Sequence, residues 1–533
     1  MSGVGVGSNG TTRVVVVGHG MVGSRFADDL HARDAERRFH VTVLGAEEYE
    51  PYNRVLLSEV VAGKLDVASL SLPRSVRERT SVLPGTSAVA LDRAQQLVVD
   101  SAGCTYPYDV VVLATGARAR IPALDGLATG DDDGALPAGV HALRTLDDAR
   151  EIVAATVNAR TAVVVGAGVL GLEVACGLAH RGLDVTVVHG GASLMDRQLD
   201  GDAGAVVTGE LGRLGIGVRL AARTQEVLVR DGRLEGVRLE GGERLDADLL
   251  VLTAGTVPDV GLAQRAGLDV ARGVVVGPDL AAPADPRVFA IGDCAEPPEG
   301  GTGLIAQGWD QARRLALLLT GQRDDPADAD PEATAPAGAP LPQGGTDVVR
   351  VKAVGLDVVS MGVSGTRRST DAGHRSVRLT DPVGGRHVEV VVADGRVVGA
   401  TCVGAGQVAA DLVAAYTRAT PAPSDPAQLL LRPVGGAPEP AASPTLMPDR
   451  TTVCRCNGVT KGEIVACWRH GADTVEDVAR ETRATTGCGG CTDVVCGLLD
   501  WLGTTDPDRA RAREPRRVVG DVVPEVEEPA RAR

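Results

Sequence analysis

The chain has 533 residues, 44% of them hydrophobic but only 2% aromatic, and a formal net charge of −16 at pH 7. Single hydrophobic cores stop growing well below this length, so we expect several domains. The negative charge, which no basic block offsets locally, argues against a nucleic-acid partner. The sequence has no apolar leader and no run of eighteen apolar residues, which predicts a cytoplasmic protein without a membrane span.

The first motif along the chain is a valine-rich segment, 14–17, followed by Gly18, Gly20 and Gly23 in the spacing G-x-G-x-x-G. The first glycine permits a tight turn, the second lets a pyrophosphate approach the backbone, and the third lets a helix pack against the strand. The pattern therefore predicts a strand, a phosphate-binding loop and a helix. After the next apolar strand come two acidic residues, Glu47 and Glu48, either of which could bind a ribose hydroxyl; we choose Glu47. A solvated loop carboxylate is the alternative.

A second complete unit of this kind contains Gly166, Gly168 and Gly171 between a valine-rich strand and a helix. Two such units are hard to obtain by chance and predict two Rossmann-like dinucleotide-binding domains. The strand that follows the second unit ends at His189 and not at an acidic residue, and the first arginine beyond it is Arg197. The residues themselves therefore leave both NADH and NADPH open as donors.

Three further strand ends carry glycine or acidic residues. They contain Thr115 with Gly116, then Gly255, and then Gly292 with Asp293. In this order, over residues 13–320, the chain resembles flavoprotein reductases in which one Rossmann-like domain holds FAD and an inserted second one holds NAD(P)H. The resemblance implies that Asp293 contacts the ribityl chain of the flavin. A turn-forming aspartate that closes a strand is the other interpretation.

Disulfide reductases of this fold carry a pair of cysteines beside the flavin, and this chain has no such pair. Between Gly18 and Asp293 the cysteines are Cys104 and Cys176, far apart in sequence. Cys294 is interpreted as a small buried hydrophobic residue. We therefore expect electrons to leave the flavin by another route.

The segment EPYNRVLLSEVVAGK, residues 50–64, resembles the segment beside FAD in ferredoxin and rubredoxin reductases. It is also similar to the N-terminal half of the large subunit of assimilatory NAD(P)H nitrite reductases. The resemblance implies that Arg54 and Lys64 contact the flavin. Because NADH is the common donor in the nitrite-reductase family, it also implies a modest preference for NADH, with NADPH as the alternative.

Two β-hairpins are predicted after a linker rich in Pro, Ala and Asp that starts near residue 322. Segments 347–362 and 386–404 alternate apolar and polar residues, and an Asp-Gly pair marks the turn in the second. A second linker rich in Pro, Ala and Gly follows.

Four cysteines near the C-terminus form two close pairs, CxC and CxxC, with thirty-one residues between them: Cys454, Cys456, Cys488 and Cys491. In a reducing cytosol, such pairs indicate a metal site or catalysis and not disulfides. Two helices with capping patterns are predicted between the pairs, at Thr460 with Glu463 and at Thr474 with Asp477. Four thiolates accept either zinc or an iron-sulfur cluster, and the spacing favours iron-sulfur about two to one.

The cysteine pattern resembles the BFD-like 2Fe-2S domain, named for bacterioferritin-associated ferredoxin, which also follows the flavin domains in the nitrite-reductase large subunit. The resemblance implies that the four paired cysteines bind one 2Fe-2S cluster and that Cys467 and Cys496 are packed thiols. A sirohaem domain would need several hundred more residues and another cysteine cluster. We therefore expect a chain like the electron-transfer subunit of bacterial assimilatory nitrate reductase, which does not itself reduce nitrite.

The predicted fold is α/β: two Rossmann-like domains, the FAD domain being interrupted by the NAD(P)H domain, a small β-rich α+β domain and a small helical BFD-like domain. The expected boundaries are 11–140 and 266–321 for the FAD-binding segments, 141–265 for the NAD(P)H-binding domain, 322–345 and 419–450 for linkers, 346–418 for the β-rich domain, 451–503 for the BFD-like domain and 504–533 for a disordered tail.

The predicted activity is electron transfer from NADH through FAD and a 2Fe-2S cluster to a partner protein, and no side chain is assigned a catalytic role. The expected partner is a molybdenum-containing nitrate reductase catalytic subunit or a nitrite reductase. Two alternatives stay open: a reductase of the ferredoxin or rubredoxin type that serves an oxygenase, and a reductase of ferritin iron. The sequence does not predict an oligomeric state.

Overall fold

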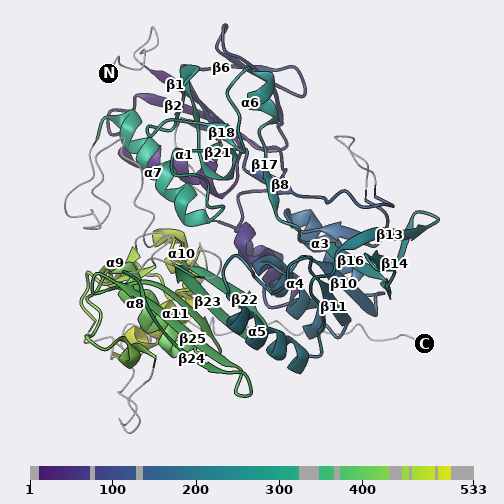
Figure 1. Ribbon diagram of the computed structural model, residues 1–533. Coiled ribbons are helices and arrows are strands. Elements are labelled where there is room, and N and C mark those ends of the chain that lie inside the picture. Colours follow the sequence, from purple (N-terminus) through teal and green to yellow (C-terminus); the bar gives the residue numbers. More distant parts are fainter. Residues whose placement is uncertain are drawn as a thin grey trace, which may run out of the picture. The chain divides into compact units, whose positions relative to one another are not determined.

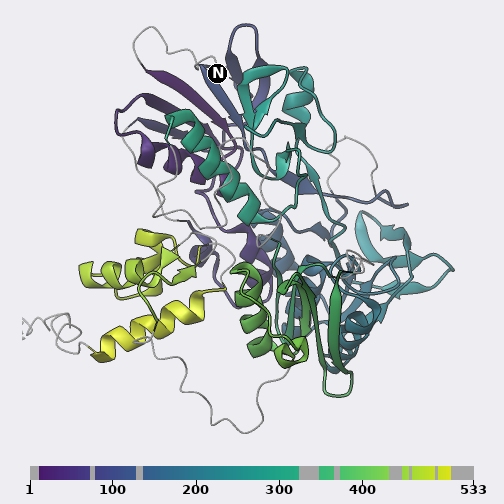
Figure 2. The same ribbon diagram turned by 60° about the vertical axis from the view of Figure 1, so that its left-hand side comes forward.

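The computed structural model describes residues 11–72, 79–127, 136–322, 347–364, 373–430, 447–454, 459–486 and 490–505. The chain divides into two compact units, residues 1–437 with 486–488, and residues 438–485 with 489–533. Figures 1 and 2 show their helices and strands coloured along the sequence. Most of the predicted linker 322–345 and of the predicted tail 504–533 lies outside the described residues.

A six-stranded sheet forms the first dinucleotide-binding domain of the larger unit. Its order is β19 (Ala281–Ala282), β20 (Asp285–Ala290), β7 (Val110–Leu113), β1 (Thr12–Val17), β2 (Phe39–Leu44) and β3 (Thr80–Leu83). From β20 to β3 the strands are parallel. The central strands are buried on both faces, which explains their continuous valine runs. Because β19 and β20 follow the second dinucleotide-binding segment, the domain is built from two separated pieces of chain, as predicted.

Helices α1 (Met21–Arg33) and α7 (Ile305–Thr320) pack against each other beside this sheet (Figure 1). Shorter elements complete the domain: β4 (Ala88–Asp92), β5 (Leu97–Asp100), β6 (Thr105–Pro107), β18 (Val274–Val275) and β21 (Ala295–Glu296). Helix α2 (Leu57–Val61), from the same segment of chain, buries its apolar residues in the core of the second dinucleotide-binding domain. Helix α6 (Gly261–Arg265) buries its apolar residues in the core of this domain. The sequence had placed this segment in the NAD(P)H-binding domain, because five residues are too few for their apolar pattern to show which core they join.

A five-stranded parallel sheet forms the second dinucleotide-binding domain. Its order is β12 (Gly217–Arg219), β11 (Asp184–Val188), β10 (Thr161–Val165), β16 (Leu249–Leu252) and β9 (Val140–Ala142). Its helices are α3 (Leu146–Ala155), α4 (Val169–His180) and α5 (Gly201–Arg213), and an antiparallel sheet of β13 (Thr224–Arg230), β14 (Arg233–Leu239) and β15 (Arg244–Asp246) is attached. The strand pair β8 (Ala117–Ala119) and β17 (Thr256–Pro258) lies where the chain passes between the two domains.

The β-rich domain contains the two predicted hairpins in one antiparallel sheet. The order is β22 (Val349–Ala353), β23 (Leu356–Gly362), β26 (Arg396–Val403), β25 (Arg386–Ala393) and β24 (Arg375–Asp381). At the turn of the second hairpin Asp394 and Gly395 both have positive φ, 48° and 70°, a conformation that Asp-Gly favours. Helix α8 (Gly406–Thr417) packs on the sheet, and the 3-10 helix η5 (Pro426–Leu429) lies within the segment expected to be the second linker.

The smaller unit is helical, with α9 (Lys461–His470), α10 (Val475–Thr482) and α11 (Thr492–Thr505) beside the short strands β27 (Thr452–Cys454) and β28 (Val459–Thr460). Both predicted capping boxes are present: Thr460 and Thr474 each accept the backbone N–H of the acidic residue three positions later. The three helices enclose one small apolar core. Across the parts of the chain that the structure describes, none of the helices is long and apolar enough to cross a bilayer.

Candidate flavin, nicotinamide and cluster sites

The first glycine loop has the shape that a bound pyrophosphate requires. Gly18 has φ +118°, and a Cβ added there would lie 2.1 Å from the carbonyl oxygen of Ala114; at Gly23 it would lie 2.0 Å from that of Gly18. A Cβ at Gly20 would meet no heavy atom of the described residues within 4 Å. Gly20 is the N-cap residue of α1, so this open space faces the N–H groups at the start of a thirteen-residue helix. The loop therefore fits a dinucleotide.

The second glycine loop repeats this geometry. Gly166 has φ +114°, a Cβ at Gly171 would lie 2.0 Å from the carbonyl oxygen of Gly166, and Gly168 again faces space free of described atoms within 4 Å. The hydroxyl of Thr253, at the end of β16, donates to the carbonyls of Val165 and Gly166 at 3.1 and 3.0 Å. Thr253 thus fixes the loop from the neighbouring strand, a role that the sequence did not reveal.

The predicted residues at the other strand ends lie where the chain passes between the two domains. The Thr115 hydroxyl donates to the Asp259 carbonyl at 2.6 Å, and the Asp259 N–H donates to the Gly116 carbonyl at 2.9 Å. Gly255 has φ +96°, and its carbonyl accepts the N–H of Arg120 at 2.9 Å. These bonds flank the pairing of β8 with β17 and stabilise the two segments in which the chain passes from one domain to the other.

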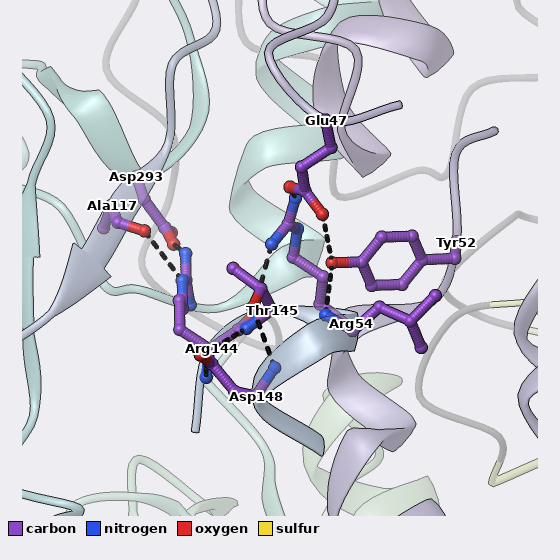
Figure 3. Close-up of polar contacts among 9 residues, drawn as sticks. Glu47, Tyr52, Arg54, Ala117, Arg144, Thr145, Asp148 and Asp293 are labelled. Carbon is purple, nitrogen blue, oxygen red and sulfur yellow. Dashed lines mark hydrogen bonds and ion pairs between the residues drawn. The ribbon is translucent and has the colours of Figure 1, made fainter. Parts of the chain in front are cut away.

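Glu47 is the centre of a polar network that includes the predicted Arg54. The Tyr52 hydroxyl donates to Glu47 at 2.7 Å and accepts the N–H of Leu146 at 2.9 Å. The Arg54 guanidinium pairs with Glu47, lies over the Tyr52 ring and donates to the Arg144 carbonyl at 3.2 Å. Burial raises the pKa of Tyr52, so its hydroxyl remains a donor. Figure 3 shows Glu47, Tyr52 and Arg54 converging from the segment after β2.

Arg144 extends this network to the predicted Asp293. Its guanidinium donates to the Asp293 carboxylate at 2.7 Å and to the Ala117 carbonyl at 2.8 Å. Its own N–H, like that of Thr145, donates to Asp148 at 2.7 Å in the capping box that begins α3. As Figure 3 shows, Arg144 lies between Asp293 and the group around Glu47. The sequence does not single out Arg144, although the Thr-x-x-Asp cap next to it marks the place where α3 begins.

A cleft opens beside Asp293, lined among others by Ala117, Pro258 and Gln307. Gly292, with φ +76°, donates its N–H to Gln311 at 2.7 Å, which fixes the turn that presents Asp293. The structure thus brings a strand end of the FAD domain, the chain crossing and Arg144 to one place. A polar cleft next to a glycine-lined helix N-terminus can hold the ribityl and phosphate groups of a flavin dinucleotide.

Two candidate residues, the acidic Glu48 and the basic Lys64, lie outside this network. Glu48 is exposed, whereas Glu47 takes part in the network. Lys64 is exposed in the turn after α2, where its N–H donates to the Glu59 carbonyl at 2.9 Å and its charge acts on the Glu59 carboxyl. The structure does not place Lys64 with Glu47, Arg54 and Asp293.

The end of β11, where an acidic residue would bind the ribose of NADH, is occupied by His189. Its Nδ1 accepts the N–H of Ala167 in the second glycine loop at 3.4 Å, and its Nε2 lies 4.0 Å from Asp196. Arg197 is exposed. Arg223 lies beside the residue that follows His189, since its Cγ would be 3.2 Å from a Cβ added at Gly190. A cation that could meet a 2′-phosphate is therefore present at Arg223 as well as at Arg197.

The cysteines of the reductase region are not arranged as a redox pair. Cys176, on α4, and Cys294 are buried, whereas Cys104 is exposed. Burial raises the pKa of Cys176 to about 12 and also raises that of Cys294, whose thiol donates to the carbonyls of Leu113 and Ile291. The thiolate is the reactive form of cysteine, so both thiols are inert near neutral pH.

In the smaller unit, Cys454 and Cys491 are 2% and 7% exposed and belong to the same apolar core. Cys456 and Cys488 lie outside the described residues. Cys467 donates to Glu481 at 3.0 Å, and burial together with this carboxylate raises its pKa to about 12. The Cys467 thiol therefore stays protonated and is unsuited to bind metal. Cys454 and Cys491, distant in sequence but in the same buried core, fit a cluster held by thiolates.

Comparisons with known proteins agree with this geometry. Residues 12–314 match the family model of pyridine nucleotide-disulphide oxidoreductases, and residues 452–501 match the BFD-like [2Fe-2S] binding domain. A Bacillus subtilis NAD(P)H nitrite reductase is 30% identical over 510 residues, 95% of this chain and 59% of the relative. The assimilatory nitrate reductase electron transfer subunit of the same organism is 30% identical over 504 residues, 93% of this chain and 60% of the relative.

Among solved structures, putidaredoxin reductase in its covalent complex with putidaredoxin superposes with a TM-score of 0.63 at 24% identity, covering 78% of this chain and 95% of that one. This likeness concerns the fold. The chain spans about three fifths of the length of the two curated relatives. The comparisons confirm the predicted fold and the predicted cofactor domains, for FAD, a nicotinamide dinucleotide and a 2Fe-2S cluster.

Proposed function

The chain belongs to the pyridine nucleotide-disulphide oxidoreductase family, and from this premise we propose that it passes electrons from NADH through FAD and a 2Fe-2S cluster to a partner reductase. The observation that carries the proposal is the combination of inert thiols in the reductase region with a cysteine-bearing domain on the same chain. A family member without a redox-active cysteine pair needs another electron acceptor. The match at residues 452–501 supplies one.

The protein's own residues bind and orient the cofactors in this proposal. Gly18 permits the tight turn and Gly20 leaves room for the pyrophosphate of FAD, and the Arg144–Asp293 pair with Glu47 would hold its sugar and ribityl hydroxyls. FAD bound there would supply the conversion between hydride transfer, which moves two electrons, and single-electron transfer, and a 2Fe-2S cluster would supply a one-electron acceptor. Cys454, Cys456, Cys488 and Cys491 would hold that cluster, in a cytoplasmic setting that keeps thiols reduced.

The proposed partner is a molybdenum-containing nitrate reductase catalytic subunit. The name of the Bacillus subtilis relative that matches over 93% of this chain, an assimilatory nitrate reductase electron transfer subunit, supports this choice. A nitrite reductase, an oxygenase-linked ferredoxin or rubredoxin, and ferritin are the competing acceptors.

The decisive experiment separates flavin reduction from electron delivery. In Cys491→Ser we expect NADH to bleach the flavin as in the wild type, while reduction of the purified nitrate reductase subunit is lost. Cys488→Ser should behave in the same way. Cys467→Ser is the matched control: it changes a buried cysteine of the same core whose thiol is protonated, and it should keep delivery intact.

Metal analysis of wild-type protein purified without oxygen should find iron and sulfide, about two of each per chain. Stoichiometric zinc in place of iron, or full delivery by Cys491→Ser, would refute the proposed route. Faster reduction of a ferredoxin, a rubredoxin or ferritin than of the nitrate reductase subunit would refute the proposed partner and leave the route intact.

A further inference from the structure

A row of buried polar side chains crosses the otherwise apolar face that the β-rich domain turns toward α5. Ser360, Thr401 and Glu389 are paired across β23, β26 and β25, and each is 2% exposed. Arg378 on β24 is paired with Glu389 and continues the row. Two residues along β25, on the same face, lies His387, which is fully buried. Ser360 donates to the Gln198 carbonyl at 3.1 Å and Glu389 accepts from Ser376 at 2.5 Å. His387 is the member of the row that still needs an explanation, because burying a polar group without a partner is unfavourable.

His387 has one ring nitrogen in use and one that is not. Nδ1 lies 2.9 Å from the hydroxyl of Thr380, its register partner on β24. Nε2 is buried and has no hydrogen-bond partner among the described residues. If Nδ1–H donates to Thr380, Nε2 carries a lone pair, the arrangement found in histidines that bind metals through one nitrogen and are oriented through the other. Burial lowers the pKa of His387, which keeps the ring neutral.

Two carboxylates face this histidine. A ring nitrogen of His387, a carboxylate oxygen of Glu389 and one of Asp200 all lie within 4.8 Å of one another. Asp200 is the N-cap residue of α5: one of its oxygens accepts the N–H of Ala203 at 2.9 Å, and the other is directed to this cluster. Around a tetrahedral ion with bonds of about 2.1 Å, ligand atoms stand about 3.4 Å apart, so the three groups would have to approach one another by up to about 1.4 Å to complete a site.

Arg378 already pairs with the carboxylates of this cluster. It lies 3.7 Å from Asp200, 3.0 Å from Asp202 and 3.2 Å from Glu389. Asp202 is 59% exposed, whereas Glu389 is buried. A cation bound by Asp200 and Glu389 would therefore compete with this guanidinium.

We infer that Asp200, His387 and Glu389 bind a divalent first-row transition-metal ion that ties α5 of the second dinucleotide-binding domain to the β-rich sheet. One imidazole and two carboxylates suit Mn²⁺ or Zn²⁺, and the remaining positions would be filled by water. Arg378 competes with the ion for Glu389 and Asp200, and on binding would keep its pair with Asp202. None of these three ligands is a cysteine proposed to hold the cluster.

Mn²⁺ is the probe of choice, because thiolates select softer metals and bind it poorly. Titration of the purified full-length protein with Mn²⁺, followed by the loss of the EPR signal of the free ion, should show one tightly bound ion per chain. His387→Gln keeps a hydrogen-bonding group beside Thr380 and should weaken binding at least tenfold. His40→Gln, at an exposed histidine, should bind as the wild type does. The bound flavin spectrum verifies folding in each variant.

Arg378→Gln distinguishes a metal site from a simple ionic contact between domains. If the cluster binds metal, removal of the competing guanidinium should tighten Mn²⁺ binding severalfold, and added Mn²⁺ should raise the melting temperature of this variant. Equal Mn²⁺ affinity in the wild type and His387→Gln, or weaker binding in Arg378→Gln, would overturn the inference.

Discussion

The guanidinium of Arg144 donates to the carboxylate of Asp293 at 2.7 Å, although 149 positions separate the two residues. The contact joins the start of α3 to the turn after β20, and Arg54 reaches the same place through the Arg144 carbonyl. Predicted flavin contacts from both halves of the FAD domain therefore depend on a residue that lies between them.

Arg144→Ala should weaken FAD binding about 10- to 100-fold, because a hydrogen bond between charged groups is worth roughly 1.5–3 kcal/mol and Asp293 loses its positioning partner. Flavin fluorescence during dilution or competition gives the dissociation constant. Arg150→Ala is the matched control, since Arg150 lies on α3, close to Arg144 in sequence, in an exposed pair with Asp147. Equal flavin affinity in Arg144→Ala and the control would contradict this role.

Gly20→Val should remove the flavin and leave the fold intact. The backbone at Gly20 has φ −83°, which any residue adopts, and a side chain there enters the open space where the pyrophosphate is expected. Gly23→Ala should instead destabilise the whole domain, because its Cβ would lie 2.0 Å from a backbone oxygen. The ratio of flavin to protein absorbance and the melting temperature separate the two effects. Full flavin occupancy in Gly20→Val would refute the assignment.

The wild type should prefer NADH modestly, an expectation drawn from family resemblance. His189→Asp should raise the ratio of kcat/KM for NADH over NADPH roughly tenfold, about 1.4 kcal/mol, because a carboxylate at the end of β11 accepts ribose hydroxyls and repels a 2′-phosphate. Steady-state kinetics with both donors measure this ratio. A strong NADPH preference in the wild type would refute the expectation and would make Arg223 and Arg197 the residues to replace first.

Iodoacetamide at pH 8 should label Cys104 and leave Cys176 and Cys294 unmodified, because the raised pKa of each buried thiol keeps it protonated. Raising the pH toward 9 should not change this, since the pKa of Cys176 is about 12. Peptide mass spectrometry reads the labelling. The double variant Cys176→Ser with Cys294→Ser should still reduce its flavin with NADH. Loss of that reduction would show that a thiol takes part after all.

How much the sequence could predict follows from the range of the interactions. The glycine loops, the Asp394–Gly395 turn and the caps at Thr460 and Thr474 are set by neighbours a few positions apart, so their residue types indicate them directly. Arg144 is different. Its partner is distant in sequence, and an arginine beside a helix cap has no local feature that identifies it.

The same reason hides the contacts between domains. Glu173 on α4 is 4% exposed; it accepts the Ser58 hydroxyl at 2.6 Å and the Lys352 N–H at 2.9 Å, and the Lys352 ammonium lies 3.3 Å away. This carboxylate joins three domains of the larger unit. In the sequence it is one acidic residue in an otherwise apolar helix, and nothing near it indicates what neutralises it.

Lys352→Met should therefore destabilise the larger unit by about 3 kcal/mol, because it leaves Glu173 buried without its cation. Adding Glu173→Gln should recover most of this loss, since the amide still accepts from Ser58 and carries no charge that burial penalises. Arg350→Met on the same strand is the control: its side chain is exposed, and it should change stability by less than about 0.5 kcal/mol. Thermal unfolding followed by circular dichroism supplies the comparison. If the two losses simply add in the double variant, Glu173 and Lys352 are not energetically coupled and the contact contributes only packing.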